Sequence, residues 1–232
     1  MPDEIDIPEC LRFRKRGPMK FFNMDSPLMR FMTKVANLMI VNVAFLLTCL
    51  PVVTVGAATT ALYYVTLKMI RDEESGILRS FFMAFRANFR QATALWLGQL
   101  ALMVLLLVDL RILAQIDSPI AAAMNTGIFL ILAAVLLICL YAYALVAQYE
   151  NTLLVTLKNA CLMALGSLPQ TLLMGAFCTG CAVITFYNGY TASYAVPVWM
   201  FLGFGLVAFG NSAILNKVFS KYIPDASRDT NA

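Results

Sequence analysis

The sequence predicts an all-α integral membrane protein: a six-helix transmembrane bundle with one or two in-plane amphipathic helices on the cytoplasmic side. Composition is the first reason, because 61% of the 232 residues are hydrophobic and 13% are charged, against about half and about a quarter in soluble proteins. Clustering is the second, since several apolar runs approach or exceed the roughly 20 residues that cross a bilayer. No polar segment is long enough for a separate catalytic domain.

The predicted organisation is one transmembrane domain between two polar tails. Residues 1–24 form a basic cytoplasmic tail, residues 25–222 the membrane domain, and residues 223–232 a polar tail. The first helix is expected to begin at Asp25-Ser26-Pro27, because Asp and Ser accept free N–H groups and Pro is favoured at the first helical position. The predicted spans are about 27–50, 55–70, 92–113, 123–147, 168–187 and 195–215.

The stretch LPVVTVGAATTALYYVTLKMIRDEESG, from Leu50 to Gly76, decides the topology of the first half. The 36 residues from Val35 to Ile70 are too many for one untilted crossing of about 30 Å at 1.5 Å per residue. Pro51 interrupts this run, and Thr54 is available to cap a second helix. We therefore expect two short spans joined by a tight turn. A re-entrant loop remains the alternative, because it returns the chain to the same side.

Residues 77–91, ILRSFFMAFRANFRQ, are amphipathic rather than uniformly apolar. Arg79, Arg86 and Arg90 fall within about 40° on a helical wheel, and a different face collects Leu78, Phe81, Phe82, Phe85 and Phe89. This pattern predicts a helix that lies in the membrane surface. Residues 148–166, which include Lys158, are a weaker case of the same kind. The three arginines and Lys158 are the candidate partner-binding residues.

The distribution of basic residues predicts the orientation. On this map 16 of the 17 Lys and Arg residues lie on the side of both termini, and Arg111 alone lies near the opposite face. Cytoplasmic loops carry such an excess. We therefore expect a multi-pass protein of the bacterial cell membrane with both termini in the cytoplasm.

Polar side chains inside the apolar runs are the candidate functional groups, because they are costly in a membrane. Hydrogen bonding between helices is the simpler role, and a substrate or ion site is the other. Asp109 and Arg111 cannot pair side by side, because two residues are about 200° apart on a helix. The intramembrane polar candidates are Asn37, Asn42, Gln99, Asp109, Arg111 and Asn211.

Two further groups have structural expectations. Gly56 and Thr60 are four residues apart and predict a small-residue face where another helix approaches closely. The alternative for this segment is a polar cavity lined by Thr59, Thr60, Tyr63 and Tyr64. Aromatic residues near the end of the fourth span are expected to anchor it at the membrane interface. They are Tyr141, Tyr143 and Tyr149.

Several classes of chemistry find no residues in this chain. It has no histidine, which removes histidine-based acid–base catalysis and most zinc sites. It has no GxxxxGK[ST] phosphate-binding loop. Cys178-Thr-Gly-Cys181 has CxxC spacing, but a thiol in hydrocarbon is inert. We expect no enzyme activity, no cofactor, no metal and no nucleic-acid partner.

The run DSPLMRFMTKVANLMIVNVAFLLTCLPVVTVGAATTALYYVTLKMIRDEESG, followed by SFFMAFRANFRQAT, resembles the YesL family of bacterial membrane proteins, a domain of unknown function. The resemblance is closest over residues 19–95, and LPVVTVGAATTALYY is its most specific part. It implies a multi-pass membrane protein. It also implies a role in carbohydrate uptake or its control, because members are often encoded beside carbohydrate ABC importers and sugar-responsive regulators.

The expected function is therefore that of a non-enzymatic accessory or regulatory partner. It would dock on subunits of a carbohydrate ABC importer or on a sugar-sensing kinase, within the lipid bilayer. The alternative is a small transporter or channel that acts on its own, with polar groups gathered inside the bundle.

Overall fold

A computed structural model describes residues 27–73, 76–116 and 118–222. The chain forms two units, Met1–Ala36 and Asn37–Ala232, and each is described by itself. The predicted tails at 1–24 and 223–232 and the Asp25-Ser26 helix start lie outside the described residues. Within the described residues, all regular elements are helical and none is a strand.

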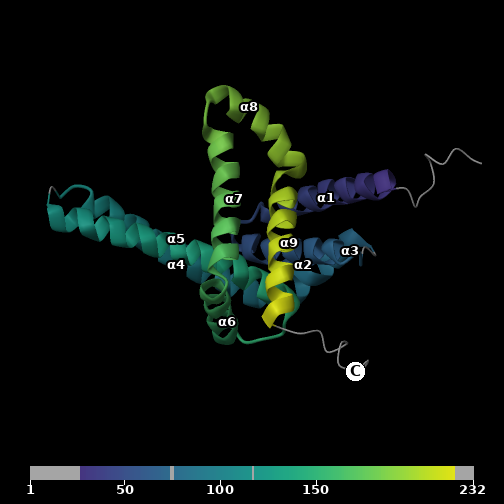
Figure 1. Cartoon of the computed structure of the whole chain (residues 1–232), viewed down its shortest axis with the longest axis horizontal. Coiled ribbons are helices and arrows are strands. Elements are labelled where there is room, and N and C mark those ends of the chain that lie inside the picture. The colour runs from purple at the N-terminus through teal and green to yellow at the C-terminus, as the bar shows by residue number, and fades with distance from the viewer. Residues whose placement is uncertain (1–26, 74–75, 117, 223–232) are drawn as a thin grey trace, which may run out of the picture. The chain divides into compact units, whose positions relative to one another are not determined.

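Residues 27–222, apart from the gaps named above, contain eleven helical elements, and Figure 1 labels α1 to α9. Nine are α-helices, η3 is a 3₁₀-helix and η4 is a π-helix. Their bounds are α1 Pro27–Cys49, η3 Val52–Thr54, α2 Val55–Ile70, α3 Ile77–Ala87, α4 Phe89–Leu113, α5 Pro119–Gln148, α6 Leu153–Gly166, α7 Leu168–Phe186, α8 Gly189–Val198, η4 Trp199–Gly203 and α9 Phe204–Tyr222.

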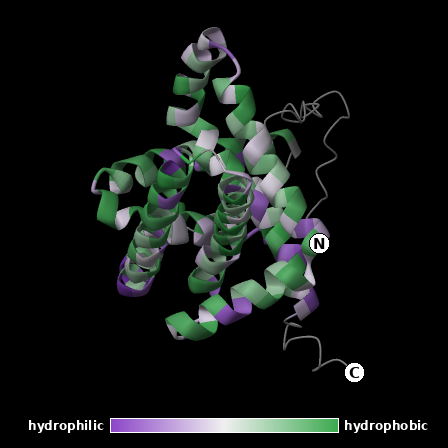
Figure 2. Ribbon diagram, turned by 90° about the vertical axis from the view of Figure 1, so that its left-hand side faces the viewer, coloured by the Kyte–Doolittle hydropathy of each residue, from purple (hydrophilic) through white to green (hydrophobic). Residues whose placement is uncertain are grey.

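Six helical stretches are long and apolar enough to cross a membrane, so this part of the fold prediction is confirmed. Figure 2 shows hydrophobic residues over most of the ribbon. Large apolar side chains such as Leu130 and Ile184 are 64% and 71% exposed, which indicates a surface in contact with lipid. The six stretches are Leu28–Cys49, Val52–Ile70, Phe89–Leu113, Pro119–Gln148, Leu168–Phe186 and Ala192–Tyr222.

Helix α2 is the centre of the second unit. It packs against α3, α4, α5 and α9, and 11 of its 16 residues are buried. Its small residues allow this, because Ala57, Ala58 and Ala61 leave room for neighbouring helices. These neighbouring helices therefore shelter the backbone of α2. For this stretch the sequence left two paths open, a full span and a re-entrant loop.

Thr54 does not cap α2, so that expectation is wrong. Its Oγ1 instead donates to the carbonyl oxygens of Thr48, at 2.5 Å, and Pro51, at 2.7 Å. The physical reason is the 3₁₀ turn η3, which gives Thr54 helical dihedral angles of −89° and −5°, whereas a capping residue is usually extended. Thr54 therefore fastens the turn to the end of α1.

Helix α3 packs on α2 and carries the predicted amphipathic pattern. Phe81 is fully buried, whereas Leu78 and Phe82 are 45% and 43% exposed. The expected single helix over residues 77–91 is wrong, because α3 ends at Ala87 and α4 begins at Phe89, so that Arg90 belongs to α4. Asn88 separates the two helices, with dihedral angles of −98° and 4°. The apolar face of α3 is thus divided between contact with α2 and open surface.

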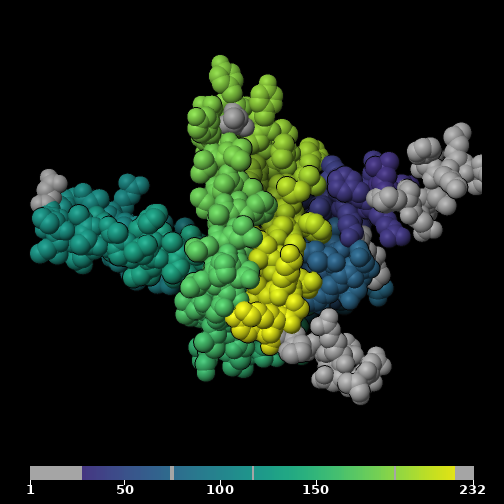
Figure 3. Space-filling view, viewed as in Figure 1, coloured from purple at the N-terminus to yellow at the C-terminus, as the bar shows by residue number. Residues whose placement is uncertain are grey.

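Two hairpins complete the second unit. In the first, Ser118 caps α5 by accepting from the Ile120 N–H, with Pro119 in the first turn. In the second, α8 and η4 connect α7 to α9, and Figure 3 shows the side chains of α7 and α9 packed against each other. The sequence analysis did not anticipate the π-helical turn η4, which follows Pro197 and interrupts the last span.

Candidate functional site

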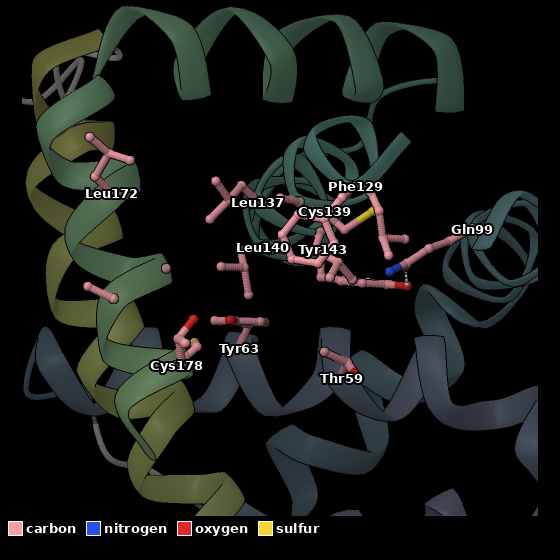
Figure 4. A pocket seen from close by; sticks show the side chains of 16 residues that line it. Thr59, Tyr63, Gln99, Phe129, Leu137, Cys139, Leu140, Tyr143, Leu172 and Cys178 are labelled. Carbon is pink, nitrogen blue, oxygen red and sulfur yellow. Dashed lines mark hydrogen bonds between the residues drawn. The ribbon is translucent and has the colours of Figure 1, made fainter. Parts of the chain in front are cut away.

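A cavity of about 820 Å³ lies between α2, α4, α5 and α7 (Figure 4). Its lining is mainly aliphatic, with polar atoms from only a few side chains, and it contains no Asp, Glu, Lys or Arg. The lining residues are Thr59, Tyr63, Gln99, Phe129, Leu132, Ala133, Leu136, Leu137, Cys139, Leu140, Tyr143, Leu172, Gly175, Ala176, Cys178 and Thr179.

One polar pair in the cavity joins α4 to α5. The Tyr143 hydroxyl donates to Gln99 Oε1 at 2.6 Å, and Figure 4 shows this bond at the cavity wall. In this arrangement the amide oxygen faces the Tyr143 hydroxyl, and the NH₂ group is not used in the bond. Gln99 Nε2 has no acceptor among the described residues.

A second polar cluster joins α2, α7 and α9. Asn211 is fully buried, and its Nδ2 donates to Cys178 Sγ at 3.2 Å. The Tyr63 side chain lies beside both residues. Within the described structure, Asn211 Oδ1 has no partner with full hydrogen-bond geometry.

Asn42 holds the interrupted last span. Its Nδ2 donates to the carbonyl oxygens of Trp199, at 3.0 Å, and Met200, at 2.7 Å, while its Oδ1 accepts from the Gly205 N–H at 2.8 Å. A π-helical turn leaves backbone groups without their usual partners. Asn42 is fully buried, and it therefore supplies partners for backbone groups at this turn from within the protein.

The other intramembrane polar candidates lie apart from Gln99, Asn211 and Asn42. Asn37 is half-buried on α1, Asp109 is half-buried near the end of α4, and Arg111 is exposed. In the described part of the chain, neither Asp109 nor Arg111 forms an ion pair. The structure thus separates the predicted polar residues into several places rather than one site.

The predicted packing residues lie where α2 meets α4. A Cβ atom on Gly56 would collide with the Ala92 carbonyl oxygen and lie 2.6 Å from Trp96 Cβ. Thr60 is fully buried, and its hydroxyl finds no partner among the described residues. The backbones of α2 and α4 therefore approach closely at Gly56.

Arg79, Arg86 and Arg90 are all exposed, and we call them the arginine face. Across the described ranges, none of the three forms an ion pair or a hydrogen bond. The opposite side of α3 is held by Phe81, Ser80 and Ala84, which are buried. Lys158 is also exposed but lies on another helix, α6, which packs on α5.

Two of the tyrosines expected to be interfacial anchors are instead internal. Tyr141 is fully buried and hydrogen-bonds the Thr171 hydroxyl at 2.9 Å, and Tyr143 is 6% exposed. The place of Tyr143 in the cavity was not predicted, whereas Thr59 and Tyr63 belong to the set that the sequence offered as an alternative cavity lining. The polar hydroxyls of Tyr63 and Tyr143 within apolar runs were a signal, but the positions of Gln99 and Asn211 on other helices supply their partners.

The side chains that commonly bind metals are scattered over the described residues. No group of three or more Cys, Asp or Glu side chains gathers within them. The cysteines among them are free thiols, including Cys178 and Cys181 of the CxxC sequence. The polar groups of the cavity are therefore amide, hydroxyl and thiol, which bind neutral ligands.

Comparison with known proteins gives one family match. Residues 38–110 match the model of a family described as "Protein of unknown function, DUF624". The matched segment runs from within α1 to near the end of α4, and so contains α2, α3 and the arginine face. No curated protein and no solved structure matches the chain.

Proposed function

We propose that this protein is a non-enzymatic accessory or regulatory partner of a carbohydrate ABC importer or a sugar-sensing system in a bacterial cell membrane. The resemblance to the YesL family supports the carbohydrate context, and the DUF624 match covers the same region of the chain. In this proposal both termini and the arginine face are cytoplasmic, and α3 and α6 lie at the membrane surface.

The arginine face is the observation that carries the proposal. Arg90 lies in the first turn of α4, and Arg79 and Arg86 project from α3, whose opposite side is held by Phe81 against the buried helix α2. Such a helix presents its charges in a defined arrangement. Guanidinium groups match carboxylates in geometry, and complementary charge across an interface favours one partner over others. The proposed partner surface is therefore acidic.

Replacing Arg79, Arg86 and Arg90 together with Glu is expected to reduce recovery of the partner at least about tenfold, because attraction becomes repulsion. The measurement is affinity purification in mild detergent, with co-purifying proteins identified by mass spectrometry. The triple Lys variant keeps the charge and should retain much of the binding. Arg111→Glu is the control, since Arg111 lies on the opposite side in this topology. Unchanged recovery with the triple Glu variant would reject the arginine face as the contact.

The second candidate function is a small transporter or channel, which the cavity favours. Its mainly aliphatic lining provides few groups to replace the water around a sugar, and so the accessory role is preferred. The two are separated by flux in proteoliposomes that contain this protein alone. The accessory proposal expects no flux through this protein alone. Measurable sugar flux that falls in the Asp109→Asn variant would reject the accessory role and support the transporter.

The proposed orientation is tested by cysteine labelling in intact cells, after the native cysteines have been replaced. Val52→Cys lies in the exposed turn between α1 and α2, and Glu73→Cys lies beyond α2. If α2 is a full span, a membrane-impermeant thiol reagent labels position 52 and not position 73. Labelling at neither position identifies the re-entrant loop, and labelling at position 73 from outside contradicts the orientation.

A further inference from the structure

We propose that the cavity between α2, α4, α5 and α7 is a binding site for a neutral, apolar carbonyl compound, and that the Gln99 amide recognises its carbonyl oxygen. This site is separate from the arginine face and does not depend on the proposed function. Its argument rests on the size of the cavity, the chemistry of its wall and one oriented donor.

The size and lining fit a small apolar molecule. A volume of about 820 Å³ lies within the roughly 300–1,000 Å³ of small-molecule pockets, which are mostly apolar with a few placed polar groups. Side chains from α5, including Leu136 and Leu137, form much of the wall, and Leu172 and Gly175 of α7 face it. Four helices thus line one pocket, which is partly open to the surface, since Phe129 and Leu172 in its lining are 63% and 64% exposed.

The donor is Gln99 Nε2. Because the Tyr143 hydroxyl donates to Gln99 Oε1 at 2.6 Å, the amide cannot turn its oxygen toward the cavity without losing that bond. The NH₂ group has no acceptor among the described residues, and half-buried Gln99 lines the pocket, so this donor is available to a molecule bound there. An acceptor on a bound molecule would satisfy it.

The wall also determines the charge and polarity of the ligand. It contains no Asp, Glu, Lys or Arg, and so it cannot compensate an ion removed from water. Its aliphatic surface stabilises hydrocarbon in proportion to the buried area. A ketone, quinone or ester with an apolar body satisfies both conditions, whereas a free sugar would leave many hydroxyls unpaired.

The probe for this site is benzophenone, a neutral diaryl ketone whose excited carbonyl inserts into nearby C–H bonds. Full-length protein in phosphatidylcholine nanodiscs is irradiated at increasing membrane fractions of the probe, and adducts are located by peptide mass spectrometry. We expect saturable adducts on residues 129–140 of α5 and 172–179 of α7. Leu136→Trp should fill the cavity and remove them, whereas Leu130→Trp, on the same helix but outside the cavity lining, should not.

The role of Gln99 is tested with two competitors that do not absorb the irradiating light. Phenyl benzoate carries a carbonyl, and diphenylmethane has two rings and no acceptor. Phenyl benzoate should compete about fivefold better in the natural protein, equivalent to one hydrogen bond of about 1 kcal/mol. The difference should disappear in Gln99→Leu. An equal potency of the two in the natural protein would reject Gln99 as the recognition group.

The remaining outcomes are equally decisive. Adducts that rise linearly with the membrane fraction of probe, and spread to exposed positions such as Leu130 and Ile184, would show partition into lipid alone and overturn the site. Saturable cavity adducts that persist in Leu136→Trp would place the probe elsewhere and do the same. Since neither readout involves a protein partner, failure here leaves the accessory function untouched.

Discussion

Replacing Asn42 with leucine is expected to destabilise the protein by about 2–4 kcal/mol, or about 5–15 °C in the midpoint of thermal aggregation in detergent. The substitution keeps an apolar side chain of similar size but removes all three bonds to the last span. The carbonyl oxygens of Trp199 and Met200 and the Gly205 N–H then have no partner from α1. A buried donor or acceptor that loses its partner costs more free energy than the hydrogen bond had contributed to stability.

Asn125→Leu on α5 is the matched control for this prediction. Its Oδ1 is buried and has no partner within the described structure, so the same substitution should leave the midpoint unchanged or raise it. An Asn42→Leu variant as stable as the natural protein would show that the π-helical turn does not need the asparagine. A fall of equal size in both variants would attribute the effect to apolar substitution in general.

Gly56→Leu is expected to have an effect at least as large, with a fall in the aggregation midpoint of about 10 °C or loss of monodisperse protein. Its Cβ alone would meet the Ala92 carbonyl oxygen, and Trp96 Cβ would lie 2.6 Å away. Both atoms belong to α4 and are fixed by its backbone. Neither can move aside by a side-chain rotation, so α2 and α4 must separate.

Gly98→Leu provides the comparison, because it changes a glycine of α4 around which a Cβ would meet nothing within 4 Å. It should preserve or increase stability, since leucine favours helix more than glycine does. If Gly56→Leu melts at or above the temperature of Gly98→Leu, close approach of α2 and α4 at this position is not needed for stability.

Much of the fold could be predicted from local sequence. Apolar runs of sufficient length, interrupted by polar or proline-containing turns, predicted six apolar helices, and the structure confirms that number. Ser118-Pro119 marked the start of a helix, and the structure shows Ser118 capping it. These features depend on residues within a few positions of each other, and periodicity and capping rules can therefore predict them.

The candidate site could be predicted from local sequence only in part. Gln99 and Asn211 were identified as costly polar residues in apolar runs, but Tyr143 was assigned to an interface, and Tyr63 was named only in an alternative in which it lines a polar cavity. Tyr143 is 44 residues from Gln99, and Asn42 is 157 residues from Trp199. No local pattern relates residues so far apart, because either face of an apolar helix can contact lipid or protein.

Hydropathy and helical periodicity are properties of consecutive residues, and they predicted a helical membrane protein with a basic amphipathic segment. The roles of the buried polar groups depend on helix packing. It paired Asn42 with a π-helical turn, turned Tyr141 inward, and placed Gln99 beside a cavity. The physical reason is that a hydrogen bond in an apolar environment depends on which helices meet, and helix packing, rather than hydropathy, decides this.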